Sequence, residues 1–149
     1  MIRSKEKLSY LVTVSMKHVL PAKMLLRTLI PKTTAKIVLV GNVEPSDAQT
    51  FRAMGAEYID EREIDLSSRL PKITWDWKYR FFGWYFQHFI RLSIDRFMTS
   101  EQVVVLDSEV FVFDNWDESR FYDQASGRPR CFYWIPSKRK DEWEYKMYR

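Results

Sequence analysis

The chain is poor in cysteine, in glycine and in long apolar runs, and each shortage excludes a class of protein. Its single cysteine, Cys131, rules out an intramolecular disulfide and is expected to be an inert core thiol in a reducing compartment. Only four glycines are present, which argues against a disordered or linker-rich chain. No apolar run approaches the ~20 residues of a membrane span, and no signal peptide is visible, so we expect a cytoplasmic protein without an integral membrane segment.

Several functional motifs are also missing. The sequence has neither a G-x-G-x-x-G fingerprint nor a P-loop, which disfavours dinucleotide and kinase-type phosphate sites. One cysteine and two histidines give no zinc-binding spacing, and no Ser/His/Asp or Cys/His order indicates a hydrolase. The net charge of +4 suits anionic small ligands but is too weak alone to indicate DNA or RNA. A basic nucleic-acid binder, with aromatic side chains stacking on bases, remains a weaker alternative.

Strand-like and helical patterns alternate through the first 60 residues. Strands are expected at 8–15, 36–40 and 56–60, and helices at 22–30 and 45–54. Pro21 suits the first turn of its helix, and Gly55 suits the position that follows the end of a helix. Such alternation with short links is typical of right-handed βαβ units. We predict an α/β fold with a mostly parallel central sheet flanked by helices, in a single domain spanning 1–149.

The second half contains a long loop, one aromatic-rich helix and further strands. The expected elements are a loop at 60–74, a helix at 77–97, a buried central strand at 103–106, a strand at 110–113, a short helix and loop at 121–127, a strand at 130–134 and a helical tail at 141–149. In the long helix an apolar stripe is predicted from the spacing of Phe81, Trp84, Tyr85, Phe89, Leu92 and Phe97.

Two acids follow the buried strand that is expected at 103–106. Asp107 and Glu109 stand two residues apart, and such residues of an extended chain point to the same face. Two converging carboxylates repel each other unless a cation or a proton lies between them. Since open α/β sheets place ligands at the carboxyl ends of their strands, the pattern indicates a site for a hard divalent ion. The alternative is a strand end whose acids pair with nearby arginine or lysine.

Other polar residues are expected around the same edge of the sheet. Ser15 and Asp60 follow the first and third strands, where contacts to a base or a ribose are expected. Arg80 and Arg91 lie on the aromatic helix and suit phosphate oxygens, although a solvated helix face explains them as well. His18 follows the first strand and is read mainly as a loop residue.

One part of the chain resembles a known family. The helix Gly83-Trp84-Tyr85-Phe86-Gln87-His88-Phe89-Ile90-Arg91-Leu92 and the strand Val103-Val104-Val105-Leu106-Asp107-Ser108-Glu109-Val110-Phe111-Val112 are similar to the pair found in GT-A glycosyltransferases. The resemblance is greatest to bacterial capsule or lipopolysaccharide-type transferases, and the order of motifs also resembles glycosyltransferase family 8. The specific match covers 80–113. Glu109 stands where the family's D-x-D motif has its second Asp, and His88 stands where a Gln is common.

The resemblance implies a Rossmann-like GT-A nucleotide-sugar-binding fold and a metal-dependent sugar transfer. Asp107 and Glu109 would bind Mn²⁺ or Mg²⁺, which bridges the diphosphate of a nucleotide-sugar donor and stabilises the leaving group. The donor site is expected to comprise Ser15, Asp60, Arg80, Arg91, Asp107 and Ser108. The partners are then the nucleotide-diphosphate sugar and a glycan or other acceptor, without nucleic acid.

The acceptor side is not evident in the sequence. Enzymes of this family continue past the metal motif with an acceptor site and a base or nucleophile, and no residue after Phe113 clearly supplies them. The catalytic residue and the anomeric outcome therefore stay open. The chain is then either the nucleotide-sugar-binding half of a longer enzyme, truncated on its C-terminal side, or a compact variant, and an oligomer is a further alternative. The alternative function is a non-catalytic or incomplete nucleotide-sugar-binding module that needs a partner or a missing C-terminal half.

Overall fold

A computed structural model of the protein describes residues 7–64, 82–121, 125–126 and 128. The chain divides into two compact units, Met1–Trp116 and Asp117–Arg149, and the second contains the short 3-10 helix Glu118–Phe121. The predicted elements at 130–134 and 141–149, most of the loop at 60–74 and the start of the helix at 77–97 lie outside the described residues. Arg80 and Cys131 lie outside them as well.

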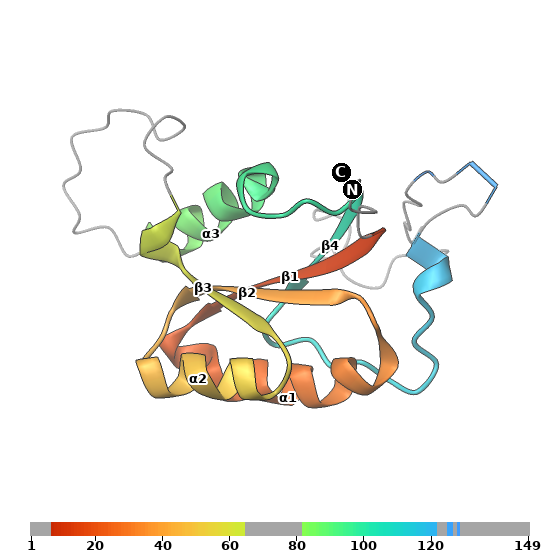
Figure 1. Ribbon diagram of the computed structural model, residues 1–149. Coiled ribbons are helices and arrows are strands. Elements are labelled where there is room, and N and C mark those ends of the chain that lie inside the picture. The colour runs from red at the N-terminus through yellow and green to blue at the C-terminus, as the bar shows by residue number, and fades with distance from the viewer. Residues whose placement is uncertain (1–6, 65–81, 122–124, 127, 129–149) are drawn as a thin grey trace, which may run out of the picture. The chain divides into compact units, whose positions relative to one another are not determined.

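The first unit is built on a four-stranded sheet in which every strand pair is parallel (Figure 1). The strands are β1 (Leu8–Ser15), β2 (Lys36–Asn42), β3 (Glu57–Asp60) and β4 (Gln102–Asp107), in the order β3-β2-β1-β4. This arrangement confirms the predicted α/β class with a parallel sheet flanked by helices. The bounds of β1 agree with the prediction, and those of β2 and β3 differ from it by one or two residues.

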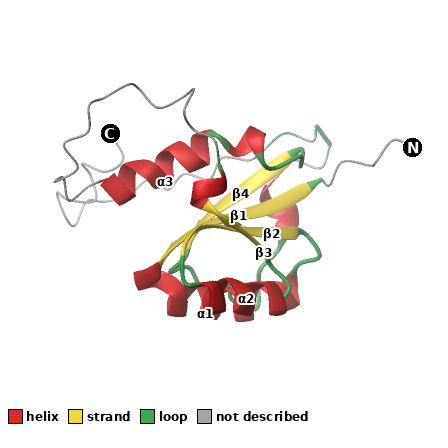
Figure 2. Ribbon diagram, turned by 60° about the vertical axis from the view of Figure 1, so that its left-hand side comes forward, coloured by secondary structure: helices red, strands yellow, loops and turns green. Residues whose placement is uncertain are grey.

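Helices cover both faces of the sheet (Figures 1 and 2). The helices α1 (Val19–Leu29) and α2 (Pro45–Ala53) pack on one face, and α3 (Phe82–Leu92) packs on the other. Because successive strand residues face opposite ways, Tyr10 and Val12 of β1 join the α1 and α2 layer, whereas Leu11 joins Ile90 on the α3 side. The strands of the interior are therefore apolar on both faces, as parallel sheets require.

The residues after β4 differ from the prediction. Residues 110–113 do not form a strand, because the backbone N–H of Val112 donates to the Thr28 hydroxyl of α1 (3.2 Å) and not to a neighbouring strand. Two further contacts hold the segment on the α1 side of the sheet: a Lys32–Asp114 ion pair (2.6 Å) just after α1, and the Trp116 indole N–H, which donates to the Tyr10 hydroxyl of β1 (3.1 Å). The segment therefore adds to the α1 layer, and β4 remains the last strand of the sheet on that side.

Two further expectations are corrected. In the described part of the chain β4 is an edge strand, and Val105 is exposed, so the strand is neither central nor fully buried. The aromatic helix ends at Leu92 and not at Phe97, because the N–H of Ser93 bonds the carbonyl of Ile90 and a separate 3-10 turn follows. Leu92 is exposed and does not belong to the apolar stripe.

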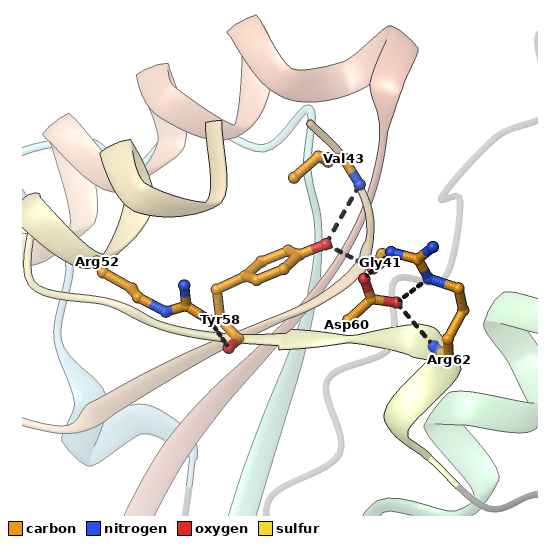
Figure 3. Close-up of polar contacts among 6 residues, drawn as sticks. All are labelled: Gly41, Val43, Arg52, Tyr58, Asp60 and Arg62. Carbon is orange, nitrogen blue, oxygen red and sulfur yellow. Dashed lines mark hydrogen bonds and ion pairs between the residues drawn. The ribbon is translucent and has the colours of Figure 1, made fainter. Parts of the chain in front are cut away.

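The end of β2 is fixed by two close contacts. Gly41 runs so near β1 that a Cβ atom built on it would lie 1.8 Å from the carbonyl oxygen of Val14. The buried Tyr58 hydroxyl donates to the Gly41 carbonyl (2.6 Å) and accepts from the Val43 N–H (3.2 Å), as Figure 3 shows. Burial raises the pKa of this phenol, which stays neutral and can make both bonds.

Candidate functional site

The winding of the chain reverses between β1 and β4. From β1 the chain passes through α1 to β2 on one side, and it later reaches β4 on the other side of β1 through α3, which covers the opposite face. At such a switch point the two flanking connections leave the sheet in opposite directions, which opens a crevice beyond the carboxyl ends of the strands. The residues there belong to the ends of β1 and β4.

Asp107 is the last residue of β4 and lies beside Thr13 of β1. The Arg91 guanidinium of α3 donates to the Asp107 carboxylate and also to the Thr13 hydroxyl (3.1 Å). Arg91 is mostly buried, and its Nε has no hydrogen-bond partner within the described residues. The Asp107 side chain is 70% exposed, so its carboxylate is open to solvent and to a ligand. The arginine therefore ties α3 to both strands at the switch point.

Glu109 takes a different partner. Its Oε1 lies 3.0 Å from Nε2 of His18, in the short 3-10 helix Met16–His18 that follows β1. The other ring nitrogen of His18, Nδ1, lies 2.9 Å from the Ser15 hydroxyl. Ser15, His18 and Glu109 therefore contact one another in sequence and connect the end of β1 with the turn after β4. The Glu109 side chain is 65% exposed.

The relation between the two acids is not the one expected from strand spacing. The extended chain ends at Asp107, and the Val110 N–H donates to the Asp107 carbonyl (3.1 Å), which closes a turn through Ser108 and Glu109. The rule that alternate residues share a face does not apply inside a turn, and the two carboxylates take partners from different elements: Arg91 of α3 and His18 of the 3-10 helix after β1. Ser108 is buried in this turn.

Asp107 and Glu109 offer a divalent ion two protein carboxylates at most at this edge. Within the described ranges, no cluster of three or more His, Cys, Asp or Glu side chains stands ready to hold a metal. Mg²⁺ in nucleotide sites commonly takes only one or two protein carboxylates, and phosphates and waters complete its coordination. Asp107 and Glu109 are both largely exposed, so their carboxylates are accessible to an ion from solvent.

Sequence reasoning named the acids, Ser15 and Arg91 but missed the pairs that they form. Arg91 with Asp107 and His18 with Glu109 are contacts between distant parts of the chain. The only local signal was the spacing of three residues between Ser15 and His18, which suits a contact within one helical turn.

Asp60 lies apart from the other candidates, at the carboxyl end of the edge strand β3. Its carboxylate accepts from the Arg62 guanidinium (2.8 and 2.5 Å) and from the Arg62 backbone N–H (2.9 Å), as Figure 3 shows. The guanidinium bonds lower the pKa of Asp60 to about 2. Two strands, β1 and β2, separate Asp60 from β4, so the structure does not bring it beside Asp107.

The Asp60–Arg62 pair predicts a pH effect on stability. Since the pKa of Asp60 is lower in the folded chain (about 2) than its ordinary value of 3.8, the pair stabilises fully above about pH 4 and less as the pH falls toward 2. We expect Asp60→Asn to reduce the loss of melting temperature between pH 4 and pH 2. Arg62→Gln should have the same effect, because it removes the other partner. An unchanged pH dependence in both variants would contradict this assignment.

The geometry defines an open parallel α/β sheet with charged residues at its switch point. No family model, curated protein or solved structure matches the chain. Across the described segments, no helix has the length and apolar character needed to cross a membrane.

Proposed function

We propose that this protein is a metal-dependent glycosyltransferase, which transfers a sugar from a nucleotide-diphosphate sugar to a glycan or other acceptor. The observation that carries the proposal is the position of Asp107 and Glu109 beside the end of β1, where the sheet changes its winding direction. Ligands of open α/β sheets bind at that point. The resemblance of 80–113 to GT-A glycosyltransferases supports the same function and implies a GT-A fold.

The chain's own residues have distinct proposed roles. Asp107 and Glu109 would hold Mn²⁺ or Mg²⁺, and a bound ion would supply charge neutralisation for the departing diphosphate. Arg91, already at the site through Asp107 and Thr13, turns its planar guanidinium toward phosphate oxygens. Ser15, at the end of β1, offers a hydroxyl to the base or the ribose.

The remaining candidates have weaker structural support. Ser108 is buried in the turn between the two acids and is proposed to contact the donor through its backbone or hydroxyl. Asp60 is proposed to serve the donor only at the outer end of the crevice, because β1 and β2 lie between it and β4. Arg80 lies outside the described residues and keeps the role that the resemblance implies.

A second candidate function is a nucleotide-sugar-binding module that needs a partner or a further half to be active. It is favoured by the contacts of the two acids, since each already has a partner within the protein, Arg91 for Asp107 and His18 for Glu109. In that case the donor binds, but the protein does not position an acceptor group for attack on the sugar. Donor hydrolysis separates the two candidates, because binding without turnover favours the module.

Thermal stabilisation by a panel of nucleotide sugars, with and without Mn²⁺, tests the proposal. A ligand that binds the native state raises the melting temperature according to its concentration and affinity. We expect at least one donor to raise it only when Mn²⁺ is present, and the free nucleoside diphosphate to do the same. If no donor gives a manganese-dependent shift, the transferase and the binding module are both contradicted.

A further inference from the structure

The outward side of α1 is apolar although it faces solvent. Leu20 is 68% exposed, and Met16 and Met24 are exposed as well. Leu20 and Met24 are spaced by four within α1, which places them on one side of the helix, and Arg27 continues the same line three residues later. Met16 and Lys17 belong to the short 3-10 helix that leads into α1. With Lys17 they form a surface that we call the α1 outer face: Met16, Lys17, Leu20, Met24 and Arg27.

The contacts that α1 makes with the sheet and with its two neighbours show which way the α1 outer face points. The inner side of α1 packs on the sheet through Ala22, Leu25, Leu26 and Leu29. On one flank Lys23 pairs with Asp47 of α2 (2.7 Å). On the other flank the Thr28 hydroxyl accepts from the Val112 N–H of the segment after β4. The α1 outer face lies between these two flanks and points away from the sheet, where α1 runs along the outer side of the layer (Figure 1).

Two exposed phenylalanines belong to the segment that runs beside α1. Phe111 and Phe113 flank Val112, which is buried, and both of them are exposed. The Val112 backbone N–H donates to Thr28 of α1, so the backbone between the two phenylalanines lies at the helix. The acid of that segment, Asp114, is compensated by Lys32 of the same layer.

The basic residues of this region are only partly compensated by acids. From Lys7 to Val43 the sequence contains six lysines and arginines and no aspartate or glutamate. Within the described residues Lys17 and Arg27 form no ion pair, unlike Lys23, Lys32 and Lys36, which pair with acids of other elements. The outer face therefore combines long apolar side chains with uncompensated cations.

We propose that the α1 outer face docks on an anionic lipid bilayer. Apolar side chains on one helix face, with lysine and arginine beside them, are the combination that interfacial helices use to enter the headgroup region. Each basic residue near an anionic leaflet adds attraction that salt weakens.

Other occupants fit this surface less well. A second copy of the chain would bring Lys17 and Arg27 against the same cations, which disfavours self-association. Nucleic acid would pair with the cations but leave Leu20 and Met24 without a partner. A bilayer satisfies both features, and the inference does not depend on the proposed sugar transfer.

Vesicle sedimentation tests the proposal with the full chain. We expect binding to vesicles of phosphatidylcholine with about one third phosphatidylglycerol, and much weaker binding to pure phosphatidylcholine. Leu20→Glu should reduce the binding at least about tenfold. It removes an apolar side chain that enters the bilayer on docking, and it adds a negative charge that the anionic lipids repel. The paired variant Lys17→Gln, Arg27→Gln should weaken binding to the anionic vesicles and reduce its sensitivity to salt.

A matched control is available on the other side of the sheet. Leu92 of α3 is 71% exposed, so Leu92→Glu makes the same chemical change at a comparable surface position. It should bind vesicles as the unchanged chain does, and melting curves should show both glutamate variants folded. Equal loss in both variants, equal binding to neutral and anionic vesicles, or no binding would overturn the proposal. Dimerisation that Leu20→Glu abolishes, without vesicle binding, would assign the face to a second copy instead.

Discussion

Gly41→Ala is expected to destabilise the first unit by more than about 3 kcal/mol. The added methyl group would lie 1.8 Å from the carbonyl oxygen of Val14. That oxygen belongs to the backbone of β1, where Val14 is paired with β2 and its neighbour Thr13 is the last residue paired with β4, so it cannot move without disturbing this end of the sheet. The same shift would disturb the Tyr58 hydroxyl bond to the Gly41 carbonyl. Denaturant unfolding followed by circular dichroism measures the change.

Two comparisons isolate the steric cause. Gly55 has a φ of 103°, and nothing lies within 4 Å of a Cβ built there, so Gly55→Ala costs only the conformational strain, about 1 kcal/mol. Asn42→Ala, at the exposed end of the same strand, should change stability by less than about 0.5 kcal/mol. If Gly41→Ala is no worse than Gly55→Ala, the strands at this point are not as close as the structure has them.

The fold was predictable wherever a local pattern decides it. The apolar run at 8–15 has the length and composition of a buried strand, and the structure places β1 there. Gly55 marked the end of α2 because a residue without Cβ adopts the left-handed conformation at little cost. Short links between strands and helices then left few topologies other than a parallel sheet.

The errors arose where a distant residue decides the local structure. Residues 110–113 have the composition of a strand, but Thr28 of α1 takes the N–H of Val112. The spacing of Asp107 and Glu109 indicated one shared direction, whereas a turn separates them and Arg91 and His18 bind them. The sequence did offer the alternative that the acids pair with basic residues, but it could not choose the partners, because those contacts depend on the order of strands in the sheet.

Asp107→Asn is expected to abolish the manganese-dependent stabilisation by a nucleotide sugar and to lower sugar transfer or donor hydrolysis at least about 100-fold. The amide has nearly the same shape as the carboxylate and can still accept from Arg91, so the protein should remain folded. What it loses is the negative charge that a hard cation requires. Glu109→Gln should have the same effect, and Glu109→Asp should retain part of the activity because the charge persists.

The control lies at the opposite end of the same strand. Glu101 precedes β4 at its amino end and is exposed, so Glu101→Gln removes the same charge from the chain without changing the switch point. It should leave the manganese-dependent shift intact. If Asp107→Asn instead lowers the melting temperature equally with and without Mn²⁺ and donor, and the ligand shift persists, Asp107 serves only as the structural partner of Arg91. A metal at this edge would then have Glu109 as its one carboxylate ligand, and loss of the ligand shift in Glu109→Gln alone would show it.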